Sequence, residues 1–197
     1  MEIIHRQYRL IPATVEDADV YVDLQLKCLA QTYAGYGDDG FMQRQYDSRD
    51  ELVEEFLDNV SSAQSRAFLA YDTSADFSHP VGFGLSRLGP LPWESELDFA
   101  QVPAGSRELV QLYTLEQAQG HGLGQALLDA VLISGEPAYL HIVEGNAKAQ
   151  RFYEKNGFSH EGFSLTCLGS WHNPEGQSMR VGRMFRGIDI TENHTSV

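Results

Sequence analysis

Apolar residues recur along the chain with two periods, a helical one of about 3.6 residues and an alternating one of about two. The helical period predicts four helices: residues 15–31, a segment that begins at Ser48 or Asp50, a segment with Leu123, Ala126, Leu127, Ala130 and Val131 on its inner face, and residues 146–156. Runs of β-branched and aromatic residues predict strands at residues 8–11, 67–71, 81–88, 109–115, 138–143, 158–168 and 178–185. Residues 89–106 carry three prolines and are predicted to form a long loop.

The order of these elements is strand, two helices, three strands, helix, strand, helix and two strands. Helices alternate with strands only in the middle of the chain, so we expect one strand–helix–strand crossover rather than a fully alternating parallel sheet. The order therefore predicts a mixed α/β fold. We expect residues 1–197 to form one domain, with residues 188–197 as a flexible polar tail.

The composition excludes several classes of protein. The formal net charge is −14, from 14 Lys and Arg against 28 Asp and Glu, and no basic face is visible that could bind nucleic acid. No apolar run reaches the ~18–20 residues that span a bilayer. Cys28 and Cys167 fit neither a metal-ligand spacing nor a disulfide framework, and two free thiols suit a reducing compartment. We therefore predict a cytoplasmic protein with no metal, no nucleic-acid partner and no membrane partner.

A glycine-rich segment, Gln119-Gly120-His121-Gly122-Leu123-Gly124-Gln125, lies between a predicted strand and a predicted helix. Glycines at alternate positions let the backbone adopt positive φ and approach a ligand closely, and the N–H groups at a helix start favour an anion. The segment predicts a site for a phosphate or pyrophosphate, with a purely structural turn as the alternative. A Walker loop is excluded because no lysine is present, and the dinucleotide-binding glycine spacing does not fit.

Two motifs together resemble the GNAT superfamily of N-acetyltransferases. The glycine-rich segment fits the family's Gln/Arg-x-x-Gly-x-Gly/Ala signature in two registers, which begin at Gln117 and at Gln119. Residues 146–158 are similar to the family's Asn-x-x-Ala-x-x-Phe-Tyr-x-x-x-Gly-Phe helix, and residues 9–18 resemble its first strand and helix start. The segments 31–50 and 89–106 carry no such resemblance.

The resemblance implies a fold and a cofactor. The expected fold is a mixed, mostly antiparallel central sheet of about seven strands with helices on both faces. Strands four and five are expected to be parallel and splayed, because a bulge interrupts their pairing. The implied cofactor is acetyl-CoA, with CoA as product and no metal. The residues implied to bind it are Leu112, Tyr113, Thr114, Gln119, Gly120, His121, Gly122, Leu123, Gly124, Gln125, Asn146 and Tyr153.

The resemblance also implies a chemistry. Acyl transfer to an amine needs a neutral amine, a stabilised oxyanion and a protonated leaving thiolate. Tyr153 matches the family's general acid. His141 and Glu108 are alternative candidates for the base, and deprotonation relayed by water is a third; the sequence leaves these open.

The acceptor is predicted to be a primary amine: a polyamine or other small cationic amine, or a peptide amine. Between Asp38 and Asp58 eight acids stand against two bases, which suits a cation but also suits a solvated helix face. The candidate acceptor residues are Tyr33, Tyr36, Asp38 and Trp171. A loose similarity to the polyamine-acetylating branch points the same way. The alternatives are a non-catalytic acyl-CoA sensor or a structural subunit, and a homodimer is a candidate assembly.

Overall fold

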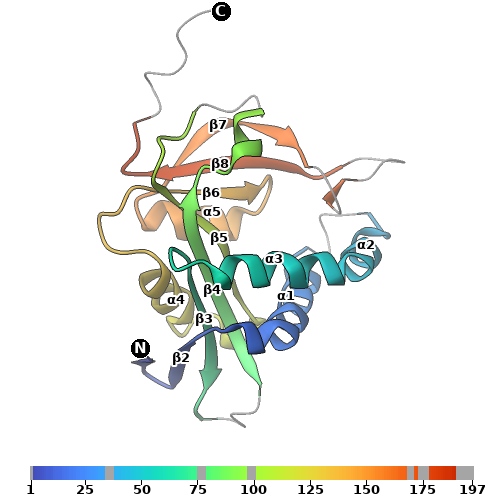
Figure 1. Ribbon diagram of the computed structural model, residues 1–197, viewed down its shortest axis with the longest axis vertical. Coiled ribbons are helices and arrows are strands. Elements are labelled where there is room, and N and C mark those ends of the chain that lie inside the picture. Colours follow the sequence, from blue (N-terminus) through green and yellow to red (C-terminus); the bar gives the residue numbers. More distant parts are fainter. Residues whose placement is uncertain are drawn as a thin grey trace, which may run out of the picture.

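The computed structural model describes residues 2–33, 38–74, 79–96, 101–167, 171–172 and 178–189. Within these residues, eight strands form a single mixed sheet in the order β1-β2-β3-β4-β5-β6-β8-β7 (Figure 1). The strands are β1 Ile3–His5, β2 Tyr8–Pro12, β3 Arg66–Asp72, β4 Pro80–Gly89, β5 Ser106–Thr114, β6 Ala138–Val143, β7 Ser159–Thr166 and β8 Arg180–Arg186. The helices are α1 Ala18–Tyr33, α2 Phe41–Asp47, α3 Arg49–Ser61, α4 Leu123–Val131 and α5 Ala147–Lys155, with short 3-10 turns η1 Val15–Asp17, η2 Pro92–Glu96 and η3 Glu116–Ala118.

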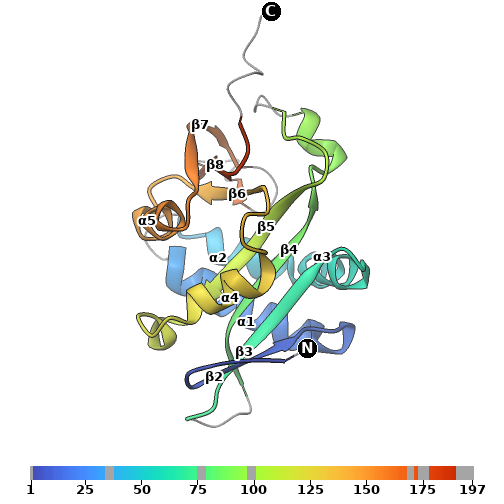
Figure 2. The same cartoon turned by 90° about the vertical axis from the view of Figure 1, so that its left-hand side faces the viewer.

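Helices cover both faces of the sheet (Figure 2). On one face, α4 and α5 bury an apolar cluster that includes Leu128, Val131, Leu140 and Phe158. On the other face, α1 and α3 bury a second cluster against β3 and β4, with Tyr21 of α1 and Phe56 of α3. Both faces of the central strands are therefore apolar where helices lie on them.

The pairing of β5 with β6 is parallel and short. Among the described residues it covers only Arg107–Leu109 of β5 against Ala138–Leu140 of β6. On the opposite side of β5, the antiparallel ladder with β4 shifts its register between Leu85 and Ser86, so that Val110 is an extra residue in β5. This bulge bends β5 at the point where β6 leaves it. The expected parallel, splayed pair is thus confirmed.

The fold class expected from the sequence is confirmed, with three differences. The described sheet has eight strands rather than about seven, because the short N-terminal β1 was not predicted, and the splayed pair is accordingly the fifth and sixth strands. Helix α2 was not predicted. The predicted loop at 89–106 contains η2. Each missed element is short, so its own residues carry little periodic signal.

Side-chain hydrogen bonds cap two helix starts. The backbone N–H of Thr14 donates to the Asp17 carboxylate at 2.7 Å, closing a capping box before α1. The Asn146 side chain accepts from the Ala149 N–H at 3.1 Å and caps α5.

Cys28 and Cys167 are buried free thiols, as predicted. In the described part of the chain, no helix combines the length and apolar character that crossing a bilayer requires.

Candidate functional site

The glycine-rich segment joins β5 to α4 through left-handed backbone. Gly120 has φ +81° and Gly122, the N-cap of α4, has φ +87°, a region that side chains with a Cβ rarely adopt. A Cβ at Gly120 would meet no atom within 4 Å. Because the first N–H groups of a helix have no intrahelical partner, the start of α4 presents donors to whatever lies in front of this open turn. The geometry suits an anion.

Most side chains of the glycine-rich segment contact other residues of the protein and are not available to a ligand. Leu123 is buried under α4, so only its main chain is available to a ligand. Gln125 donates to Asp129 one turn later at 2.9 Å. The Gln119 amide donates to the Thr114 carbonyl at 3.1 Å and accepts from Lys148 of α5. The last contact ties the glycine turn to the start of α5, across the gap between β5 and β6.

The gap itself exposes main chain. In the described residues, β5 has no ladder partner on its β6 side beyond Leu109, because β6 has diverged. Main-chain groups alternate in direction along a strand, so Leu112 and Thr114 direct theirs to this open side, while those of Tyr113 face β4. Strand main-chain groups without a partner can pair with an extended ligand. Asn146 lies at the far side of this gap, where its carbonyl oxygen caps α5 and its amide N–H₂ remains for another partner.

Three tyrosines converge on the gap from three elements. Tyr153 of α5 is 9% exposed and packs edge-on against Phe152 and Phe158. Tyr33 of α1 and Tyr113 of β5 bring their hydroxyl oxygens within 3.4 Å of each other. Burial, reinforced by Tyr33, raises the pKa of Tyr153. Tyr153 is therefore held as the neutral phenol, which can donate a proton.

The two rival bases proved to be neighbours. Glu108 is 4% exposed, and its carboxylate lies 2.7 Å from Arg87 Nε and 3.5 Å from His141 Nδ1. Burial alone would raise the pKa of Glu108, but the hydrogen bond from His141 and the Arg87 charge outweigh it and lower the pKa. Glu108 is therefore an ionised acceptor that fixes the orientation of the His141 ring.

This polar cluster continues across the sheet. His141 of β6 lies directly opposite Arg183 of β8, and Arg183 bonds the Glu161 carboxylate of β7 at 2.9 and 3.0 Å. The two side chains of that pair are 2% and 0% exposed. A row of polar side chains thus crosses five strands: Arg87, Glu108, His141, Arg183 and Glu161. The sequence interpretation missed both arginines, although each is a charged residue within a predicted strand.

The predicted acceptor residues meet only in part. Trp171 packs edge-on against Tyr33, with ring centroids 5.2 Å apart, and Phe41 of α2 completes an aromatic cluster beside the gap. Asp38 instead forms a bidentate ion pair with Arg44, at 2.7 and 3.0 Å, which lowers the pKa of Asp38 to about 2. Its carboxylate is thus already engaged by the protein. Tyr36 lies outside the described residues.

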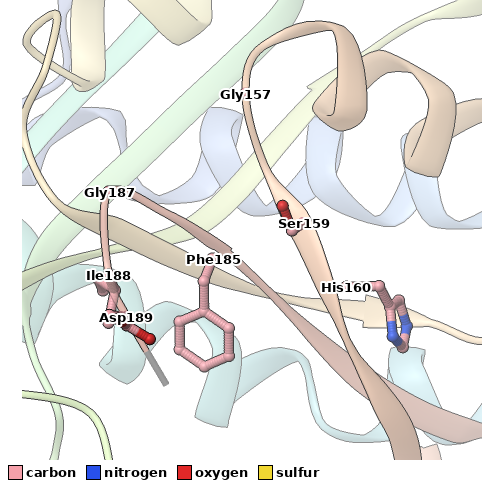
Figure 3. Close-up of a pocket in the computed structure, with 7 residues that line it drawn as sticks. All are labelled: Gly157, Ser159, His160, Phe185, Gly187, Ile188 and Asp189. Atoms are coloured by element: carbon pink, nitrogen blue, oxygen red, sulfur yellow. The ribbon is translucent and has the colours of Figure 1, made fainter. Parts of the chain in front are cut away.

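Two hollows lie away from these tyrosines. A groove of about 620 Å³ runs between α3 and the end of β4; its acidic residues are Glu51, Glu54, Glu55 and Asp58. Trp93, also in the groove, is 47% exposed and places its ring centroid 6.4 Å from that of His141. A second hollow of about 440 Å³, at the outer hairpin, contains none of the predicted site residues; Figure 3 shows Phe185 and Asp189 together at one end of it and His160 apart from them.

Comparisons with known proteins agree with the fold. Residues 64–160 match the model of an acetyltransferase (GNAT) domain. No curated protein matches the chain. Similar solved structures include the PaiA N-acetyltransferase from Thermoplasma acidophilum in complex with coenzyme A, with 19% identity, TM-score 0.58 and coverage of 91% of this chain and 98% of that one.

Two further structures extend the likeness. A GCN5-related N-acetyltransferase from Rhodopseudomonas palustris shares 16% identity, with TM-score 0.61 and coverage of 94% and 99%. The dodecameric spermidine N-acetyltransferase from Vibrio cholerae shares 22% identity, with TM-score 0.52 and coverage of 92% and 94%. At these identities, the structures establish the fold of this chain, and the chemistry has to be argued from its own residues.

Proposed function

Since the chain carries an acetyltransferase domain of the GNAT family over residues 64–160, we propose that it transfers an acetyl group from acetyl-CoA to a primary amine. One observation carries the proposal: β5 and β6 part after Leu109, immediately in front of a glycine turn with left-handed backbone at Gly120 and Gly122. A diphosphate with an extended arm fits this combination of an anion site and unpaired strand main chain.

The residues present suit such a cofactor. The turn has no Cβ at Gly120 or Gly122, so its N–H groups can approach a diphosphate closely. The unpaired main chain of Leu112 and Thr114 offers hydrogen bonds to an amide-bearing arm, while that of Tyr113 is directed at β4. When bound, acetyl-CoA supplies an acetyl group activated as a thioester. The protein then has to stabilise an oxyanion, deprotonate the amine and protonate a thiolate.

Tyr153 acts as the general acid in this proposal. Its hydroxyl lies in a buried cluster of tyrosines at the gap, and its raised pKa keeps the proton on the oxygen throughout the neutral range. The phenol donates this proton to the leaving sulfur. The backbone N–H of Leu112 donates to the oxyanion, because it faces the open side of β5, whereas the N–H of Tyr113 faces β4.

His141 is the base that the geometry favours, with Glu108 as its positioning residue. The ionised Glu108 accepts from Nδ1 of His141, which assigns the proton to that nitrogen and leaves Nε2 as the accepting atom. Arg87 holds Glu108 from the other side at 2.7 Å. Direct deprotonation by Glu108 is disfavoured, since its oxygens are already engaged by two cationic or donor groups.

The acceptor is a cationic amine. Two surfaces support this: the aromatic cluster of Tyr33, Phe41 and Trp171 beside the gap, and the acidic groove along α3, whose Trp93 lies next to His141. Acids raise the local concentration of a cation and an exposed indole stacks on it. A polyamine fits better than a neutral amine, because it can lie along several carboxylates at once.

Incubation with acetyl-CoA and a panel of amines, followed by assay of free thiol, tests the function. The panel contains a triamine, a monoamine and a peptide with a free N-terminus. We expect thiol release that depends on the amine, fastest with the triamine. A protein that binds acetyl-CoA but releases no thiol with any amine is the non-catalytic sensor, and the enzymatic proposal then fails.

A further inference from the structure

The N-terminal hairpin lies against the glycine turn. Strands β1 and β2 pair His5 with Tyr8, which leaves a two-residue turn of Arg6 and Gln7. Arg6 Nη1 donates to the His121 carbonyl at 3.1 Å. A Cβ placed on Gly122 would lie 3.3 Å from His5 Nε2 and 3.6 Å from Arg6 Nη1. Two basic side chains from the start of the sequence therefore border the turn that begins α4.

Arg6 has a long side chain at a backbone conformation that favours glycine. Its φ is +55°, and among the described residues it is the only non-glycine residue with positive φ. In a two-residue hairpin, a position with positive φ strongly favours glycine, because a Cβ is crowded there. A large side chain retained in such a strained conformation indicates that its terminal guanidinium group has a functional role.

The two side chains have spare capacity for a ligand. The guanidinium has five N–H donors, of which the His121 carbonyl takes one. His5 Nε2 is buried, and no described residue provides it with a hydrogen-bond partner. A buried ring nitrogen without a partner is rare in proteins and points to a missing one. The nearby Asp72 is occupied elsewhere, because it accepts from Gln7 at 3.1 Å and from Ser74.

Local charge points to an anion. The chain as a whole carries −14. Around the glycine turn, however, two cationic side chains approach from different elements: Arg6 bonds the His121 carbonyl from the hairpin, and Lys148 of α5 bonds Gln119. An acidic protein that gathers basic side chains at one turn favours binding of a negatively charged ligand at that turn.

We propose that Arg6 and His5 complete the diphosphate site, so that the cofactor's phosphates are held between the N-terminal hairpin and the start of α4. This inference rests on the proposed function, because it concerns the same cofactor. The guanidinium places further N–H donors toward the phosphate oxygens, and His5 Nε2 contributes one more. The hairpin is thus a specificity element for the phosphorylated end of CoA, independent of the acetyl and amine chemistry.

Calorimetric titration of the full chain with CoA and with pantetheine, which lacks the phosphates, tests the inference. The variants are Arg6→Gly and Arg6→Gln, with Arg9→Gln as the control, since Arg9 is a hairpin arginine that pairs with Glu2. We expect both Arg6 variants to weaken CoA binding about tenfold or more, as loss of a charge-assisted hydrogen bond does, and to leave pantetheine binding unchanged. Arg9→Gln should bind both ligands like the parent.

The glycine variant also separates a binding role from a structural one. Arg6→Gly relieves the strained turn, so its unliganded melting temperature should equal or exceed that of the parent while its CoA affinity falls. Parent-like CoA affinity in a folded Arg6→Gly or Arg6→Gln protein overturns the inference, as does an equal loss for CoA and pantetheine. If the parent itself does not bind CoA, the proposed function fails, and the two failures remain distinguishable.

Discussion

Replacing Tyr153 with Phe removes one oxygen from the centre of the site and leaves the packing intact. The ring stays between Phe152 and Phe158, with centroid distances of 5.3 and 5.7 Å in the parent. Within the described part of the chain, no main-chain ladder or helix cap depends on the hydroxyl. We therefore expect Tyr153→Phe to fold with nearly parental stability and to bind CoA with parental affinity, because the proposed cofactor contacts come from the glycine turn and β5.

Turnover should fall strongly. Loss of a general acid typically slows a reaction about 10²–10⁴-fold, which corresponds to ~2.7–5.4 kcal/mol of transition-state stabilisation at about 1.36 kcal/mol per decade. Burial raises the pKa of Tyr153 above its ordinary value of 10.0, so the phenol of the parent is protonated at neutral pH. Consequently, the acid form of Tyr153 is lost only above pH 10, and the loss in the variant should be the same at every neutral pH.

The assay is free-thiol release at saturating acetyl-CoA and amine, beside calorimetric titration with CoA. Tyr71→Phe is the matched control, since Tyr71 of β3 is a half-buried tyrosine whose ring packs on the α1 face. It should retain parental turnover. If kcat of Tyr153→Phe stays within a few-fold of the parent while CoA affinity is unchanged, Tyr153 serves only packing and the thiolate leaves without its help.

Three further predictions test other parts of the site. Gly122→Glu should abolish CoA binding while the fold survives, and it should cost about 1–2 kcal/mol of unliganded stability because the backbone has φ +87°. Gly120→Ala is the control, since it introduces similar backbone strain without a charge. Parental CoA affinity in a folded Gly122→Glu protein would contradict the cofactor site. The pKa of Glu108 is lowered from its ordinary 4.5, so the folded state gains stability from it above that pH and loses it as pH falls through the folded pKa. Denaturant unfolding between pH 3 and 7 should show the parent and Glu108→Gln converging in stability toward low pH, and a constant difference would refute this. Replacing Glu54 and Asp58 by Gln and Asn should raise KM for a triamine more than for a monoamine, and added salt should shrink that gap; equal salt dependence for both amines would remove the groove from acceptor choice.

Local patterns were sufficient to predict the elements that are proposed to hold the cofactor. The strand at 138–143 has the predicted bounds, and the Asn146 cap with the helix after it follows from residues close together in sequence. The glycine turn was readable for the same reason, because its positive φ values depend on a few consecutive glycines. Such features depend only on steric contacts and hydrogen bonds between residues close together in sequence, so they can be inferred from the sequence itself.

The polar cluster could not be predicted as a unit. Glu108 and His141 stood as rival bases, since the expected parallel pairing of their strands carried no register, and it is the register of Leu109 with Leu140 that brings the two side chains together. Arg87 joins them only through the β4–β5 ladder. Asp38 was misassigned for a different reason: its partner Arg44 lies in α2, a short helix that the sequence did not predict. Side chains that meet through the sheet require its strand order, which local patterns do not determine.

The buried Arg183–Glu161 pair has a consequence for how the chain folds. A slip of one residue in β8 would turn Arg183 to the opposite face of the sheet, against Leu140, Ile142 and Phe158, and would leave both charges buried without a counterion. Burying an unpaired charge costs several kcal/mol even after relaxation. The pair therefore destabilises misaligned registers of the β7–β8 hairpin. A chain in which both residues are replaced by apolar ones should discriminate less between these registers, even where its stability is higher.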